Sequence, residues 1–165
     1  MMCRQLLPYL FVFLALASTG ACAQKPVAPD RGPVVAVWDL EDLGAETEAL
    51  PITGGLLSNE IIQTIRQKGT YTVVERERLR LVLEELNLGT TSLVDESSRL
   101  RLGKVVGATL MVFGGYQTVG DLVRLDLRLV EVESGRTAKA VFKTAPAANV
   151  PQLLEAARVA AVDLL

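Results

Sequence analysis

The fold is decided by the stretch Tyr71-Thr72-Val73-Val74-Glu75-Arg76-Glu77-Arg78-Leu79. Its first four residues have strand propensity and lead directly into a charged helix start. In a helix over residues 75–87, apolar residues recur at the i, i+3, i+4, i+7 spacing, so one face is buried. These residues are Leu79, Val82, Leu83 and Leu86. We expect Gly89 to end this helix.

The segments on either side complete a packed unit around this stretch. We expect a second helix over residues 96–106, with Asp95 as its N-cap, followed by a buried apolar strand over 108–113. Upstream, the continuous apolar run 34–38 predicts a strand that is buried on both faces. Thr53 is expected to cap a helix that runs to about Lys68, where Gly69 ends it.

The second half of the chain predicts an antiparallel meander. Gly114-Gly115 interrupts the apolar strand and indicates a bulge or a bend. Gly120-Asp121 is the clearest turn, and an alternating strand follows it, with apolar side chains on one face and Arg124, Asp126 and Arg128 on the other. The alternation slips by one residue near Leu129-Val130, which predicts a bulge or a sharp twist there.

A tight turn at Ser134-Gly135 and a third strand close the meander. Asn149 is expected to cap a last helix that has Pro151 in its first turn. The predicted order is therefore strand, helix, strand, helix, helix, three strands and a helix, or β-α-β-α-α-β-β-β-α. We expect an α/β (α+β) fold in which helices pack on a single mixed β-sheet formed by residues 34–165.

Composition excludes several classes of function. The chain has 165 residues and a net charge of −2, whereas a nucleic-acid-binding protein needs a basic patch. It contains no histidine, which excludes Ser-His-Asp catalysis, histidine metal ligands and histidine pH switches. Its two cysteines, Cys3 and Cys22, lie in the first 22 residues, so the folded domain has no cysteine for a disulfide or a metal site.

Residues 1–21 have the pattern of a bacterial secretory signal: a short positive start, an apolar stretch from Leu6 to Ala17 and a run of small residues. Cys22 follows directly, as in the lipobox of bacterial lipoproteins, although Thr19 stands where leucine is usual. We expect Cys22 to be the lipid attachment site. Ordinary signal-peptidase cleavage at either of two nearby small-x-small sites is the alternative.

Residues 22–33 then form the lipidated N-terminus and a proline-rich tether, so the domain begins near residue 34. The similarity of this region to Gram-negative lipoproteins, with Ala23 after the cysteine, implies delivery to the periplasmic face of the outer membrane. The protein would then contact the membrane through its lipid anchor.

Two segments could suggest a ligand site, but both have a simpler interpretation. The acidic stretch 39–48 lacks the spacing of a calcium loop, so we expect a solvated loop. Gly54-Gly55 lacks the lysine of a phosphate loop, so we expect a close helix approach or a loose entry turn. We therefore predict no catalytic residues, no cofactor and no metal site.

The chain resembles the CsgG family of curli-assembly lipoproteins over about residues 33–145, and more loosely the LpoB-type and TolB-type periplasmic domains. The resemblance rests on 73–76 opening a helix, on Leu79, Leu83 and Glu84-Glu85, on Gly103, 106–108 and Gly114, and on 127–135. It implies a lipid-anchored periplasmic α/β domain that acts in protein secretion or assembly of surface structures through contacts with envelope proteins. A homo-oligomer is one arrangement that it allows.

The resemblance has one departure, because pore-forming members insert long membrane-crossing hairpins into this domain. Here Gly120-Asp121 joins its two strands directly, so we expect no pore from this chain alone. An LpoB-like activator that docks on a peptidoglycan synthase is the alternative, and a carboxylate-based glycan hydrolase built on the acidic stretch is a third hypothesis. Glu75 and Arg76 are candidates for an interface or an internal ion pair, or for charge at a helix start.

Overall fold

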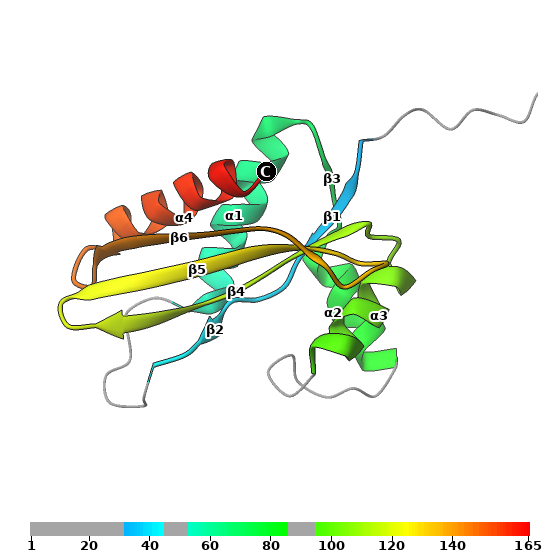
Figure 1. Ribbon diagram of the computed structural model, residues 1–165, viewed down its shortest axis with the longest axis horizontal. Helices are drawn as coiled ribbons and strands as arrows, with labels where there is room; N and C mark the ends of the chain where they lie inside the picture. Colours follow the sequence, from blue (N-terminus) through cyan, green and yellow to red (C-terminus); the bar gives the residue numbers. More distant parts are fainter. Residues whose placement is uncertain (1–31, 45–52, 86–94) are drawn as a thin grey trace, which may run out of the picture.

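Six strands form one open mixed sheet with four helices packed on it (Figure 1). The computed structural model describes residues 32–44, 53–85 and 95–165. The strands are β1 (Val34–Val37), β2 (Glu41–Asp42), β3 (Thr72–Val73), β4 (Leu110–Val119), β5 (Leu122–Glu131) and β6 (Thr137–Pro146). The helices are α1 (Gly54–Lys68), α2 (Arg76–Glu85), α3 (Glu96–Val105) and α4 (Val150–Leu164). The predicted fold class is confirmed.

The sheet has a parallel half and an antiparallel half. Its order is β3-β1-β4-β5-β6, and β1 runs parallel to both of its neighbours. The two-residue strand β2 also pairs with β4 in parallel, farther along that strand than β1 does. The strands β4, β5 and β6 form the predicted antiparallel meander. The sheet therefore ends at β3 on one side and at β6 on the other.

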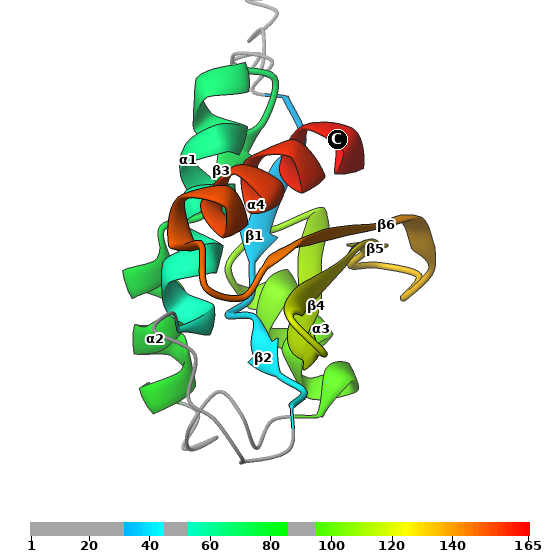
Figure 2. The same cartoon turned by 90° about the vertical axis from the view of Figure 1, so that its left-hand side faces the viewer.

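The two pairs of helices cover opposite faces of the sheet (Figures 1 and 2). Helices α1 and α4 bury one face, where Val35, Val37 and Leu125 belong to the first hydrophobic core. Helices α2 and α3 bury the other face near β1, where Ala36 and Trp38 belong to a second core. The strand β1 is thus buried on both faces, as its continuous apolar sequence predicts.

Short-range signals place the helix ends. Thr53, Asp95 and Asn149 are the N-caps of α1, α3 and α4, and each side chain accepts a hydrogen bond from a backbone N–H in the first turn. Gly69 ends α1 in the left-handed conformation with φ of 72°. These predictions are confirmed. The sequence could make them because each depends on residues within one helical turn.

The irregularity predicted at Leu129-Val130 is present, but its cause differs from a simple exchange of faces. The β5–β6 register shifts between these two residues, whereas the β4–β5 register runs unbroken through them. Leu129 belongs to the core under α1 and α4, and Val130 to the core under α2 and α3. The buried side changes along β5 because the covering helices change.

The bulge or bend expected at Gly114-Gly115 is wrong. The strand β4 passes through both residues in continuous register with Leu127 and Asp126 of β5. A Cβ at Gly114 would lie 2.3 Å from the Asp126 carbonyl oxygen, and one at Gly115 would lie 2.7 Å from the Leu43 side chain. The two glycines therefore let the backbone of β5 and the Leu43 side chain approach a regular strand closely. The alternation of apolar residues along the strand does not indicate such contacts.

The acidic stretch 39–48 is only partly the loop that we expected. Glu41 and Asp42 form β2, which pairs with Gly115 and Tyr116. Residues 45–48 lie outside the described residues, as do the signal segment, Cys22, Leu86 and Gly89. Within the described ranges, no helix is long and apolar enough to span a membrane.

Candidate interaction site

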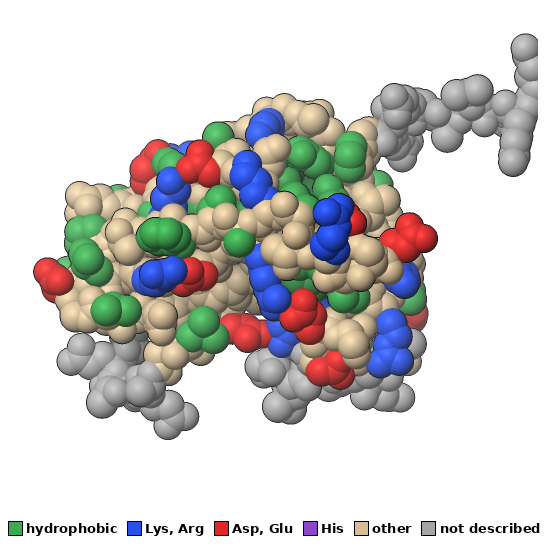
Figure 3. Space-filling view, viewed as in Figure 1, with side chains coloured by type: hydrophobic (Ala, Val, Ile, Leu, Met, Phe, Trp, Pro, Cys, Tyr) green, Lys and Arg blue, Asp and Glu red, His purple; other side chains and the backbone are tan. Residues whose placement is uncertain are grey.

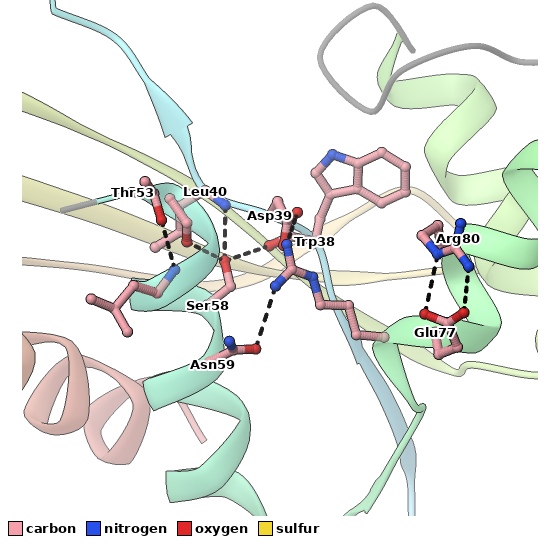
Figure 4. Close-up of polar contacts among 11 residues, drawn as sticks. Trp38, Asp39, Leu40, Thr53, Ser58, Asn59, Glu77 and Arg80 are labelled. Atoms are coloured by element: carbon pink, nitrogen blue, oxygen red, sulfur yellow. Dashed lines mark hydrogen bonds and ion pairs between the residues drawn. The ribbon is translucent and has the colours of Figure 1, made fainter. Parts of the chain in front are cut away.

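The first turn of α1 packs directly against the segment that leaves β1. A Cβ on Gly54 would lie 1.8 Å from the Leu40 carbonyl oxygen, so only glycine permits this approach. Ser58 is fully buried one turn later (Figure 4); its Oγ accepts the Leu40 N–H at 3.0 Å and donates to the Gly54 carbonyl at 2.8 Å. The close helix approach predicted for Gly54-Gly55 is what the structure has.

Arg76 begins α2 and joins three parts of the chain at this junction. Its guanidinium lies 2.5 Å from a carboxylate oxygen of Asp39, after β1, and 3.5 Å from the Asn59 side-chain oxygen on α1 (Figure 4). A Cβ on Gly55 would lie 2.9 Å from this guanidinium, so the glycine leaves room for it. Helix α2 is therefore attached to the end of β1 and to α1 through one side chain.

Glu75 and Arg76, which we singled out from the sequence, do not pair with each other. Glu75 lies 2.7 Å from Arg66 in the last turn of α1, and its side chain remains 71% exposed. The two neighbouring charges therefore contact different parts of α1, because Asn59 lies in its first half and Arg66 in its last turn. No spacing in the sequence predicts these pairs. Asp39 precedes Arg76 by 37 positions and Arg66 precedes Glu75 by nine, so each pair joins different elements.

A groove beside this junction is the first candidate surface, and we call it the α2 groove. It is about 410 Å³ in volume and lies between the end of β1 and the exposed start of α2. Apolar side chains and four charged side chains share its lining: Val37, Trp38, Asp39, Arg76, Glu77, Leu79, Arg80 and Leu83. Its charges are paired internally, which leaves an amphipathic surface without a net charge.

Glu77 and Arg80 form the charged rim of the α2 groove (Figure 4). They are 2.5 Å apart, and Arg80 also pairs with Glu84. The hydrogen bond from Arg80 lowers the pKa of Glu77, and the same bond raises the pKa of Arg80. Both groups are therefore ionised at neutral pH, and the lowered pKa makes the Glu77 carboxylate a weaker base than an ordinary glutamate.

A second hollow of about 500 Å³, the meander hollow, lies on the face of β4, β5 and β6 that is opposite α1 and α4. Arg124 lies 2.8 Å from Asp126, and its guanidinium carbon is 4.4 Å from the centre of the Phe142 ring. The other lining residues are Glu41, Leu43, Arg99, Phe113, Gly114, Gly115, Leu127, Arg128, Ala140 and Val141. Figure 3 shows hydrophobic side chains beside a pair of opposite charges on this part of the molecule.

The acidic stretch contributes charges to both hollows, each already paired. Asp39 pairs with Arg76 in the α2 groove, and Glu41 pairs with Arg99 beside the meander hollow. Among the described residues, no group of three or more histidine, cysteine or acidic side chains could hold a metal ion. Each hollow has two carboxylates in its lining, and each of these four carboxylates forms an ion pair with an arginine, so the hollows are amphipathic surfaces whose charges are paired.

Solved structures of two other bacterial proteins have a similar fold. The LpoB C-terminal domain from Salmonella enterica has a TM-score of 0.60 and 16% identity, over 70% of this chain and 84% of that one. Lipoprotein GNA1162 from Neisseria meningitidis has a TM-score of 0.58 and 13% identity, over 79% of this chain and 94% of that one. No curated protein matches significantly. At these identities the similarity establishes the fold.

The sequence profile of one protein family matches residues 16–120, which is well over half of the chain. The matched span runs from the apolar leader through β4 and includes every element around the α2 groove. It ends at Gly120, in the turn between β4 and β5. The chain belongs to the family of the curli production assembly/transport component CsgG.

Proposed function

We propose that this protein is a non-enzymatic outer-membrane lipoprotein whose CsgG-like domain acts in protein secretion or surface-structure assembly through protein–protein contacts. Membership of the CsgG family is the single observation that carries the proposal. The lipobox-like run before Cys22 supports an anchor on the periplasmic face of the outer membrane. The amphipathic α2 groove, with its charges already paired, is the kind of surface that contacts another protein.

Site-specific crosslinking in the native envelope tests this proposal. In one variant, a photo-crosslinking residue replaces Arg80 at the rim of the α2 groove. In the control variant, the same residue replaces Gln152, an exposed position of α4. We expect crosslinks from position 80 to envelope proteins of a secretion or assembly system, and none of these from position 152. The same adducts from both positions, or none from position 80, would contradict a role for the groove.

We further propose that the chain does not form a pore alone. Strands β4 and β5 are joined at Gly120-Asp121 without an inserted segment, and β5 is committed to the first core through its apolar face. Planar-bilayer recordings of the purified protein should therefore show no unitary conductance. Reproducible conductance, absent from a mock preparation, would instead favour a secretion channel.

The similarity of fold to the LpoB C-terminal domain favours one alternative, an activator that docks on a peptidoglycan synthase. Adding the purified chain to such a synthase would then increase its rate of glycan polymerisation, whereas the secretion hypothesis expects no change. The glycan-hydrolase hypothesis has no comparable support. Of the three described carboxylates of the acidic stretch, Asp39 and Glu41 form ion pairs with Arg76 and Arg99, and Asp42 accepts a hydrogen bond from the Gly44 N–H.

A further inference from the structure

The last strand of the sheet, β6, has an open outer edge. It pairs with β5 along one side, and no described strand pairs with its other side. After the register shift opposite Leu129-Val130, the pairing is regular from Lys139 to Pro146. In such a strand, alternate residues direct their backbone N–H and C=O groups away from the sheet. We call this outer side the β6 edge.

The side chains of β6 give this edge two different faces. Lys139, Val141 and Lys143 lie on the side of α4, where Val141 packs against the first core and Lys143 lies 2.7 Å from Asp163. Ala140 and Phe142 lie on the other side and line the meander hollow. Phe142 is 58% exposed although it is the largest side chain of the strand. An added strand would therefore meet a cationic face and an apolar face.

The cationic face carries more positive than negative charge. Lys143 pairs with Asp163. The hydrogen bond from Lys143 and its positive charge, with a smaller effect from Lys139, lower the pKa of that carboxyl. Two ammonium groups thus act on one carboxylate. A strand that places acidic side chains opposite these lysines would complete the charge balance, since opposite charges on directly facing residues stabilise a strand pair.

A second copy of this chain meets like charges at the β6 edge in the register centred on Val141. In an antiparallel pairing of two β6 strands about a two-fold axis at Val141, Lys139 of each copy faces Lys143 of the other. Like charges directly opposite each other destabilise a strand pair. Edge lysines are a known protection against such self-pairing. The same lysines do not oppose an acidic strand, so the edge selects its occupant by charge.

We propose that the β6 edge binds an extended segment of a partner protein in which acidic and apolar residues alternate. The acidic side chains face Lys139 and Lys143, and the apolar ones extend the surface formed by Ala140 and Phe142. The Arg124 guanidinium stacked on the Phe142 ring holds that surface in place. The segment adds a seventh strand to the six-stranded sheet. This inference rests on the proposed function in protein–protein contacts and specifies how one contact is made.

Peptide binding to the full chain tests the proposal. The probe is a fluorescent ten-residue peptide in which glutamate and valine alternate; its comparisons carry N-methyl groups on alternate amides or lysine in place of glutamate. Fluorescence polarisation should show saturable binding of the first peptide alone. The Lys139→Glu variant should bind it at least tenfold more weakly. Lys104→Glu makes the same charge change at an exposed position of α3 and should leave binding unchanged.

Several results would overturn the β6-edge proposal. These are no saturable binding of the glutamate–valine peptide, equal binding of the N-methylated peptide, or equal losses in the two lysine variants. A concentration-dependent dimer that Lys139→Glu alters would identify a second copy as the occupant instead. Crosslinking from position 80 in the Lys139→Glu background separates this proposal from the general function, because those adducts do not depend on β6.

Discussion

The junction of β1, α1 and α2 depends on single atoms. Gly54 has no Cβ where one would meet the Leu40 carbonyl oxygen, and Ser58 provides the acceptor for the buried Leu40 N–H. Arg76 is held between Asp39 and Asn59. Each contact joins residues from different elements, so the α2 groove exists only when all three elements are in place.

Replacing Gly54 with alanine should therefore destabilise the protein by about 1–3 kcal/mol, the usual cost of forcing an extra carbon into a packed site. The new Cβ would lie 1.8 Å from a backbone oxygen, so the helix start must move. Urea unfolding measures the change in free energy.

Gly55→Ala is the matched control for Gly54→Ala. Its Cβ would meet the end of the flexible Arg76 side chain, which can shift, so the free energy of unfolding should change by less than about 0.5 kcal/mol. Equal stability of the two variants would contradict the close approach at Gly54.

At the scale of elements, Leu83 of α2 belongs to the second core and Leu127 of β5 to the first. Leu83 of α2 is 3% exposed and Leu127 of β5 is 2% exposed. Either residue changed to alanine should lower the free energy of unfolding by about 2–5 kcal/mol, through lost burial and the cavity left behind. Leu81→Ala, on the exposed face of α2, should cost less than about 0.5 kcal/mol. Losses well under 1 kcal/mol at Leu83 and Leu127 would mean that the buried faces are assigned wrongly.

The N-cap of α3 predicts a dependence of stability on pH. Hydrogen bonds from the Ser97 hydroxyl, and then from the Ser98 backbone N–H and hydroxyl, hold the pKa of Asp95 well below its ordinary value. Because the folded pKa lies below the unfolded one, the stabilisation is complete above the unfolded pKa of about 3.9 and is lost as the pH falls toward the folded pKa.

Asp95→Asn keeps a capping oxygen but removes the charge, so it should be less stable than the wild type at pH 7. This difference should narrow as the pH falls below about 4, since the wild-type carboxylate then begins to lose its advantage. Urea unfolding of both proteins from pH 7 to pH 3 measures the difference. A constant gap over this range would show that the Asp95 charge does not stabilise the folded state.

At the scale of the whole molecule, the helices cover diagonally opposite parts of the sheet. The face of the meander opposite α1 and α4 carries exposed Val119, Leu122 and Phe142, whereas the same face near β1 is buried under α2 and α3. The uncovered part adjoins the open edge of β6. The α2 groove and the β6 edge therefore lie on different parts of the molecule and can be tested separately.

The proposed anchor also acts on the whole molecule. Cys22→Ser should release the protein from the membrane fraction or leave the signal segment unprocessed, because the acylated thiol is absent. Fractionation with immunoblotting measures both outcomes, and Cys3→Ser, within the signal segment, should change neither. Unchanged membrane association and normal maturation of Cys22→Ser would rule out lipidation at this residue.

Much of the fold follows from sequence signals of short range. The caps at Thr53, Asp95 and Asn149, the turn at Gly120 and the alternation along β5 were predictable because each depends on residues at most four positions apart. The same reasoning selects Glu75 and Arg76 as notable charges but does not identify their partners. Hydrophobic periodicity predicts that one face of a helix or strand is buried, but it does not identify the element that packs against that face.

The tertiary structure alone decided the features that join distant segments. The role of Gly114-Gly115 depends on Leu43 and β5, and β2 exists because Glu41-Asp42 meets the free side of β4. The pairing of Arg76 with Asp39 likewise crosses 37 positions. The sequence by itself determined the helix caps and the turn at Gly120, since those energies are local. Only packing decided which side chains meet, because contact energies depend on segments that the chain brings together after it folds.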